Sequence, residues 1–257
     1  MKRAPARVLP QAPQESAGGI PRAQGRIDLW HANLQHSGWR RLLHLLSDEE
    51  HRRADAFAFD RDARRFIVSR AVLRTLLSGI TGVPACELKF RVEQEGKPVV
   101  EPGICQPVHF SLSRSEELVL IGFAAGPLGV DIEWLDKPMD VEALADYVLA
   151  RREQDSFKRL DARDRRKAFL QCWTVKEAYL KAIGKGLSVP PAMVEVSFRP
   201  SERAGLQSIF GDVNAASRWF VDLIVPREGY IGAVVTRGGL WRTRVRAFDL
   251  CSLILCE

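Results

Sequence analysis

Hydrophobic residues recur with a helical period in two long stretches of this chain. Residues 61–80 and 163–183 each place apolar side chains at intervals of three and four, which predicts two amphipathic helices. Gly82 and Gly184 follow these stretches closely, and glycine is the residue that most often ends a helix. The pattern therefore predicts one long helix in each half of the chain.

Shorter stretches, in which apolar and polar residues alternate or apolar residues run together, predict strands. They cover residues 88–92, 118–124, 128–134, 194–199, 230–235 and 240–248. Gly126-Pro127 joins the second of these to the third, and Gly238-Gly239 joins the last two. Each of these two pairs is therefore predicted to form an antiparallel hairpin.

Each predicted helix is followed by Val-Pro, a strand and a hairpin, so the same order of elements occurs twice. This echo predicts an α+β fold built by pseudo-twofold duplication of one unit, a helix plus a three-stranded antiparallel sheet. A ligand cleft is expected between the halves. We expect a disordered, basic, proline-rich tail at 1–26, an N-terminal half at 27–125 and a C-terminal half at 126–257. Since one chain supplies both halves, a monomer is expected.

The composition excludes several classes of protein. With 257 residues, of which 46% are hydrophobic, the chain is typical of a globular protein. It contains no apolar run of about eighteen residues, so we expect no membrane partner. The five cysteines show no paired spacing, which favours reduced thiols and a cytoplasmic protein.

The formal net charge of +6 is concentrated at the start of the chain. Residues 1–26 hold five basic residues and one acidic residue, a net +4, which leaves +2 for the rest. No motif with interleaved basic and aromatic residues accompanies this charge, so we expect no nucleic-acid partner. Dinucleotide-binding, Walker and Gly-x-Ser-x-Gly motifs are also absent, so nothing favours a dehydrogenase, an NTPase or a serine hydrolase.

Two short motifs carry the candidate chemistry. In residues 128–134, Asp131 and Glu133 lie two positions apart in a predicted strand and therefore share one face. In the second predicted helix, Trp173, Glu177 and Lys181 recur at intervals of four and share one stripe. Carboxylate oxygens are the ligands that Mg²⁺ prefers, and Mg²⁺ completes its shell with water and phosphate oxygens. The two motifs together predict a metal site and a pyrophosphate substrate, without deciding between Mg²⁺ and Mn²⁺.

The same motifs resemble those of a known family. Gly129-Val130-Asp131-Ile132-Glu133 and Trp173-Thr174-Val175-Lys176-Glu177-Ala178-Tyr179-Leu180-Lys181 are similar to the two signature blocks of the 4′-phosphopantetheinyl transferases of the surfactin-synthetase-activating (Sfp) type. Upstream, Gly96-Lys97-Pro98 and Phe110-Ser111-Leu112-Ser113-Arg114-Ser115 resemble the family's Gly-Lys-Pro loop and Phe-Asn-x-Ser-His-Ser segment, and Gly184-Lys185-Gly186-Leu187 follows the second block as in the family. The resemblance spans about residues 40 to 236.

The resemblance implies a reaction and a role for each matching residue. Members of the family move the phosphopantetheine arm of coenzyme A onto a serine of an apo acyl or peptidyl carrier protein and release 3′,5′-ADP. By position, the metal ligands would be Asp131, Glu133 and Glu177. The catalytic residues would be Glu177 and Lys181, with either Glu177 or a metal-bound water taking the serine proton. Coenzyme A would contact Arg64 or Arg65, Lys97, Ser113, Arg114, Lys176 and Lys181.

Two departures from the family leave an alternative open. Arg114 stands where the family has a phosphate-contacting histidine, and Ser111 stands where it has asparagine. An arginine keeps a donor fork for phosphate but cannot titrate as an imidazole does. The alternative is a module that binds coenzyme A or another nucleotide without transferring anything. Basic residues at 151–167 would steer an acidic carrier protein, unless they are only a solvated helix face.

Overall fold

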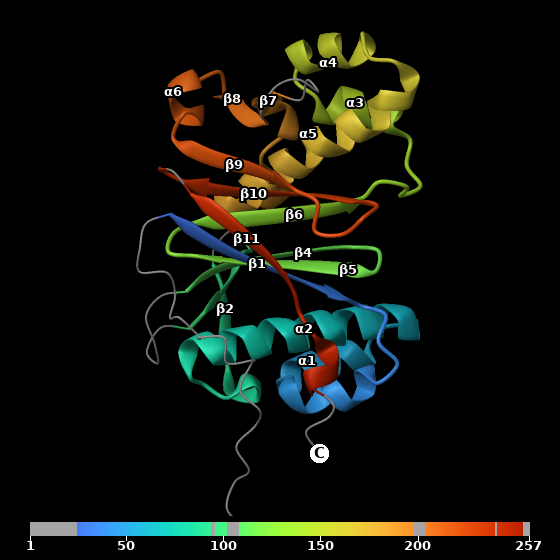
Figure 1. Cartoon of the computed structure of the whole chain (residues 1–257), viewed down its shortest axis with the longest axis vertical. Coiled ribbons are helices and arrows are strands. Elements are labelled where there is room, and N and C mark those ends of the chain that lie inside the picture. Colours follow the sequence, from blue (N-terminus) through green and yellow to red (C-terminus); the bar gives the residue numbers. More distant parts are fainter. Residues whose placement is uncertain (1–24, 94–95, 102–107, 198–203, 240, 254–257) are drawn as a thin grey trace, which may run out of the picture.

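The computed structural model describes residues 25–93, 96–101, 108–197, 204–239 and 241–253. The basic tail predicted at 1–26 lies almost entirely outside these residues. Two β-sheets pack face to face in the middle of the molecule, and one long helix covers the outer face of each (Figure 1). Within the described ranges, no helix is both long enough and apolar enough to cross a membrane.

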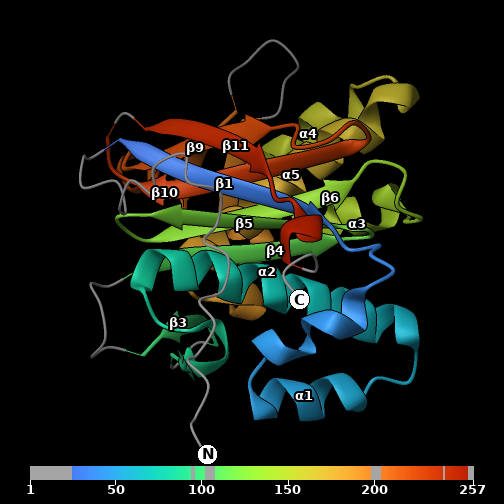
Figure 2. The ribbon, with the colours of Figure 1, turned by 60° about the horizontal axis from the view of Figure 1, so that its bottom comes forward.

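The sheets are mainly antiparallel. The first has the order β11-β1-β5-β4 and the second the order β6-β10-β9. Figure 2 shows β11 lying along β1, and these two strands form the one parallel pair among the described residues. The strands of the first sheet are β1 (Arg26–Asn33), β4 (His109–Ser115), β5 (Leu118–Ala124) and β11 (Arg242–Ala247). Those of the second are β6 (Leu128–Trp134), β9 (Trp219–Ile224) and β10 (Tyr230–Arg237).

The two predicted long helices are confirmed as α2 (Asp60–Thr81) and α5 (Ala162–Ala182). Gly82 and Gly184 both have a φ of 77°, the left-handed conformation that ends a helix at low cost. The shorter helices are α1 (Asp48–Asp55), α3 (Val141–Val148), α4 (Arg151–Lys158) and α6 (Val213–Ala216). Two small antiparallel pairs complete the fold, β2 (Phe90–Val92) with β3 (Pro98–Val100) and β7 (Val194–Ser197) with β8 (Gly205–Ile209).

The expected duplication is present in the topology. The order β1, α2, β2-β3, β4, β5 is repeated as β6, α5, β7-β8, β9, β10, and each set closes an antiparallel sheet with its first strand beside its last. The predicted fold class, a duplicated unit of one helix and a three-stranded antiparallel sheet, is therefore confirmed. A separate apolar core lies under each long helix, and a third lies between the sheets.

The two predicted hairpins are wrong. Strands β5 and β6 are not paired, because β5 pairs with β1 and β4 while β6 pairs with β10. Likewise β11 pairs with β1 of the other half and leaves β10. In both places a short glycine-containing turn carries the chain from one sheet to the other. Such a turn is equally compatible with a change of sheet and with a hairpin, so the local pattern does not separate them.

A row of serines on β4 joins the two sheets where β4 faces β6. The Ser111 hydroxyl accepts a hydrogen bond from the Val130 N–H at 3.0 Å, and Ser115 accepts one from the Trp134 N–H at 3.0 Å. These N–H groups lie on the side of β6 that does not pair with β10, so serine hydroxyls replace a backbone ladder. Their alternation places a third serine, Ser113, opposite Asp131.

Candidate functional site

Three side chains meet at the junction of β4, β6 and α5. The Ser113 hydroxyl donates to Asp131 Oδ1 at 2.7 Å, and Lys181 Nζ donates to the same oxygen at 2.6 Å and to Ser113 Oγ at 2.8 Å. Asp131 is buried, with 4% of its surface exposed, whereas the Lys181 side chain is 29% exposed. A lysine ammonium that rests on a buried carboxylate and still reaches solvent can bind an anion from outside.

A glycine sets how close the helix α5 comes to the strand β6. A Cβ placed on Gly129 would lie 1.8 Å from the carbonyl oxygen of Ala178 and 2.5 Å from the amide nitrogen of Ala182. Only glycine therefore permits the backbone of the helix to touch the strand here. This contact brings the last turns of α5, with Glu177 and Lys181, beside Asp131 in the strand.

Glu177 faces the same place with an unsatisfied carboxylate. Its Oε1 and the Asp131 Oδ2 are both buried and have no hydrogen-bond partner among the described residues. Burial raises the pKa of Glu177, and the nearby carboxylates of Asp131 and Glu133 raise it further, against the opposing charge of Lys181. Two buried carboxylate oxygens without donors are a cost that a bound cation would remove, so these residues fit a hard divalent ion.

Glu133, the third predicted ligand, is already engaged. One of its oxygens accepts from Ser115 Oγ at 2.8 Å, the other from Trp173 Nε1 at 3.2 Å, and Lys137 Nζ donates to both. Within the described residues, no group of three or more Asp, Glu, His or Cys side chains is arranged to hold a metal ion. Of the three predicted ligands, Asp131 and Glu177 are the two that keep a buried oxygen without a hydrogen-bond partner among the described residues.

A cavity of about 860 Å³ opens next to this cluster. It lies mainly against the first half, between α1, α2, β2-β3 and β4, and the end of α5 with Lys181 and Gly184 closes its other side. Lys97 and Arg114 line it, as does Lys181. The volume is in the range of pockets that bind cofactor-sized ligands, and the expected cleft between the two halves is found here.

The cations of this cavity are held in place by polar contacts. Lys97 Nζ donates to the carbonyl oxygen of Leu128 at 2.9 Å, and burial lowers its pKa. Arg114 Nη1 donates to Ser69 Oγ at 3.3 Å. Burial lowers the pKa of Arg114, and the positive charges of Arg53, Arg70 and Arg65 lower it further. A site where cations repel one another favours an anionic ligand, which would relieve that repulsion.

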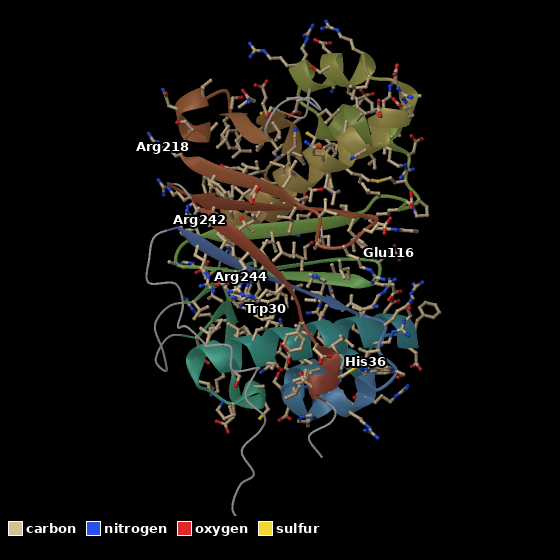
Figure 3. All side chains as sticks on the ribbon, viewed as in Figure 1. Trp30, His36, Glu116, Arg218, Arg242 and Arg244 are labelled. Atoms are coloured by element: carbon tan, nitrogen blue, oxygen red, sulfur yellow. The ribbon has the colours of Figure 1, made fainter. Side chains whose placement is uncertain are left out.

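Three of the residues predicted to contact coenzyme A have other partners in the structure and do not line the cavity. Arg65 donates at 2.9 Å to Glu116, at the β4–β5 turn in Figure 3, and at 2.9 Å to Glu117, and Arg64 lies 4.0 Å from Glu117. Neither arginine lines the cavity. Lys176 is fully buried on the other side of α5, with its ammonium bonded to Glu153. The sequence pattern gave the helix position of these residues but not their partners.

Sequence reasoning missed a cluster on the far wall of the cavity. Glu50 is buried and takes hydrogen bonds from Arg70 Nε and Arg74 Nε, and its carboxylate also accepts from the Ser47 N–H as part of a capping box. Arg74 Nη1 continues to the Leu88 carbonyl oxygen at 3.0 Å. Arg70 and Arg74 are spaced by four, which shows that they share a helix face, and Ser47-Asp48-Glu49-Glu50 has the spacing of a capping box, but neither signal pairs Glu50 with the arginines.

Comparisons with known proteins give matches over both halves of the chain. Residues 127–235 match the family described as the 4′-phosphopantetheinyl transferase superfamily, and residues 29–125 match the 4′-phosphopantetheinyl transferase N-terminal family. The chain is 32% identical over 222 residues to the 4′-phosphopantetheinyl transferase HetI of Nostoc sp., which covers 85% of this chain and 90% of that protein. It is 28% identical over 150 residues to Sfp of Bacillus subtilis, covering 58% of this chain and 65% of Sfp.

Among solved structures, the holo-[acyl-carrier-protein] synthase of Thermotoga maritima matches with 24% identity and a TM-score of 0.34, over 44% of this chain and 62% of that one. The synthase of Bacillus anthracis, solved in complex with CoA (3′,5′-ADP), matches with 23% identity and a TM-score of 0.32, over 44% and 96% of the two chains. The match to HetI extends over nearly the whole of both chains, and the two family matches together span both halves. This chain therefore belongs to the 4′-phosphopantetheinyl transferase superfamily.

Proposed function

We propose that this chain transfers the 4′-phosphopantetheine arm of coenzyme A to a serine hydroxyl of an apo acyl or peptidyl carrier protein and releases 3′,5′-ADP, in a reaction that needs Mg²⁺ or Mn²⁺. The observation that carries the proposal is the position of Lys181. Its ammonium bridges Asp131 and Ser113 at the wall of the cavity, beside the two partnerless carboxylate oxygens of Asp131 and Glu177.

The cations that line the cavity suit the two phosphate groups of coenzyme A. The reacting diphosphate would lie near the acidic cluster, where the partnerless carboxylate oxygens and the partly exposed ammonium of Lys181 occur together. Lys181 and Lys97, which reach the cavity from α5 and from the turn before β3, would hold the diphosphate. Arg114, whose environment favours an anion, would hold a phosphate on the side of α2.

In the reaction, the carrier serine oxygen forms a bond to the β-phosphorus while the bond from that phosphorus to the bridging oxygen breaks. The electron pair of the broken bond leaves on 3′,5′-ADP. Lys181 would donate to a non-bridging oxygen, where charge grows as the bonds change. A divalent ion held by Asp131 and Glu177 would supply further electrostatic stabilisation at the diphosphate.

Glu177 would hold the metal through Oε1, the buried oxygen that has no hydrogen-bond partner among the described residues. Its second oxygen would accept the serine proton, and the raised pKa of Glu177 makes the carboxylate a stronger base than an exposed glutamate. A Glu177→Gln variant keeps the shape of the side chain but removes both functions, so its turnover should fall even at saturating Mg²⁺.

The carrier protein is expected to approach over α4 and the first turns of α5. Arg151, Arg152 and Arg163 are exposed there. A surface of this charge would raise the association rate of an acidic partner, and the rate would fall as salt screens the attraction. A rate that does not change with salt would remove this part of the proposal.

We infer further that the enzyme is a cytoplasmic monomer. One chain supplies both walls of the cavity, so the site needs no second copy to be complete. The cysteines in the described part of the chain, Cys86, Cys172 and Cys251, are free thiols, as in a reducing compartment. Light scattering at micromolar concentration would test the monomer, with a dimer mass as the contrary result.

The direct test of the reaction is release of 3′,5′-ADP, followed by chromatography. The purified chain is incubated with coenzyme A, Mg²⁺ and an apo carrier protein, and in parallel with the same carrier in which the modified serine is alanine. Product with the serine carrier alone supports the proposal. Coenzyme A binding by calorimetry without product from several carriers would instead support the non-catalytic binding module.

A further inference from the structure

The buried lysine that precedes Glu177 makes three hydrogen bonds to three different elements. Lys176 Nζ donates to the Val148 carbonyl oxygen at 2.8 Å, to Glu153 Oε2 at 2.5 Å and to the Pro191 carbonyl oxygen at 3.2 Å. Val148 ends α3, Glu153 lies in α4 and Pro191 begins the 3-10 turn Pro191–Met193. An ammonium has three hydrogens, so all of them are used and none is left for a ligand.

Its partner Glu153 is the centre of the same network. The carboxylate is 4% exposed and also accepts from the N–H groups of Ala150 and Val196, both at 2.6 Å. The Cys172 thiol, one turn before Lys176 on α5, lies 3.6 Å from Glu153 Oε1. One buried carboxylate thus joins the start of α4, the strand β7 and two residues of α5. Networks with every group satisfied fix a single arrangement of the elements that they join.

The network and the catalytic cluster hold α5 from two sides. On one side the helix backbone touches β6 at Gly129, which fixes its distance from the strand. On the other side Lys176 fixes its rotation, because one residue turns a helix by about 100° and places Glu177 on the neighbouring face. Lys181 lies four residues after Glu177, and its Nζ donates to Asp131 Oδ1 at 2.6 Å. A contact at Gly129 alone would leave the helix free to roll on the strand.

The geometry points to Glu153 and Lys176 as a positioning pair for the reaction, which together set the rotation of α5 and so hold Glu177 and Lys181 against Asp131. This inference rests on the proposed function of those residues. A side-chain tip lies about 6 Å from the helix axis, so a rotation of about 20° would move it by about 2 Å. Displacements of about 1 Å in a reacting group can cost about a hundredfold in rate.

The test compares Lys176→Met with the double variant Glu153→Gln, Lys176→Met. The single variant leaves a buried carboxylate without its cation and is expected to lose stability strongly, whereas the double variant removes both charges and is expected to melt cooperatively, as wild type does. In the double variant we expect Mn²⁺ affinity in the presence of coenzyme A and kcat to fall by about tenfold or more, while KM for coenzyme A changes less than about threefold. Lys97 and Arg114, two of the three cations proposed to hold coenzyme A, lie outside α5, so its KM separates positioning from general damage.

The matched control is Glu142→Gln. Glu142 links α3 to α5 through Arg165 at 3.1 Å, but this contact lies twelve residues before Glu177, about 18 Å along the helix. The control variant should leave Mn²⁺ affinity and kcat unchanged. A crystal structure of the double variant provides a readout that needs no reaction, because we expect the 2.6 Å contact between Lys181 and Asp131 to be lost.

Two results would overturn the inference. In one, the folded double variant binds Mn²⁺, turns over and keeps the Lys181–Asp131 contact as wild type does, so the pair contributes stability alone. In the other, the double variant does not fold, so the pair belongs to the fold and has no separate positioning role. If wild type itself binds no Mn²⁺ and transfers nothing, the proposed function fails, and the crystallographic contact still decides the positioning.

Discussion

Replacing Gly129 with alanine would separate the catalytic helix from the catalytic strand. The new Cβ would stand 1.8 Å from the Ala178 carbonyl oxygen, and ordinary contact begins at about 3.4 Å. Because the obstructing atoms belong to the helix backbone, no side chain can rotate away. The helix α5 would therefore have to move from β6 by about 1.6 Å, which is the difference between those two distances.

This displacement acts on activity more than on stability. Overpacking in a core typically costs about 1–3 kcal/mol, which a domain of this size can tolerate. The same shift carries Glu177 and Lys181 away from Asp131, and about 1 Å of misplacement can lower a rate about a hundredfold. We therefore expect Gly129→Ala to melt cooperatively at a lower Tm and to retain about one hundredth of wild-type kcat or less.

The matched control is Gly122→Ala in β5. Its Cβ would meet Val130 Cγ1 at 2.7 Å and Leu29 Cδ2 at 2.9 Å, which are ends of side chains in the core between the sheets. These atoms can move, so the variant should lose stability but keep most of its kcat. Both variants are measured by thermal melting and by the rate of 3′,5′-ADP release. A Gly129→Ala enzyme with wild-type kcat, or equal loss of kcat in both variants, would show that the contact between α5 and β6 at Gly129 does not set the catalytic geometry.

Three further predictions concern the cations of the site. Lys181→Ala should retain the fold and lower kcat/KM by about a hundredfold in steady-state kinetics, because Asp131 and Ser113 lose their bridging ammonium. A loss of kcat/KM under about threefold would contradict the proposed role of Lys181. Burial lowers the pKa of Lys97 below the ordinary lysine value of 10.5, so raising the pH should neutralise its ammonium and weaken coenzyme A binding in calorimetry. The Lys97→Arg variant should keep its affinity for coenzyme A as the pH rises, because arginine stays charged. Identical pH profiles for the two proteins would contradict this role of Lys97. Arg114→Gln should raise the KM for coenzyme A by about tenfold, whereas Arg65→Gln should not, because Arg65 is neutralised by Glu116 and Glu117. A larger rise in KM for Arg65→Gln than for Arg114→Gln would support Arg65 as the coenzyme A contact.

The long helices could be predicted from the sequence, but the partners of several strands could not. A stripe of apolar residues ending at glycine is a local signal, and α2 and α5 begin and end within a residue or two of the prediction. The chain after β5 can form a hairpin with β6 or cross to the other sheet. The choice depends on the face that β6 must bury, and that face is set by β10, about a hundred residues away. Such a pairing is not visible in the few residues of a turn.

The candidate site shows the same division. Asp131, Glu177 and Lys181 were predicted together, and the structure brings them together because strand and helix periods fix their faces. Lys176 is a lysine of the same motif as Lys181, yet its ammonium bonds to Glu153 of α4. No sequence pattern marks Glu153 as its partner. The period of a helix gives the direction of a side chain, while the group that it meets is decided by the packing of the whole domain.

The proposed transfer is measured most directly by the intact mass of an apo carrier protein after incubation with this chain, coenzyme A and Mg²⁺. Parallel reactions contain EDTA, Glu177→Gln or Asp131→Ala. We predict that the carrier gains one phosphopantetheine arm with the wild-type chain, and that EDTA and both variants abolish or greatly slow the gain. An arm that is added equally well with EDTA, or by both variants, would contradict the assignment of this site.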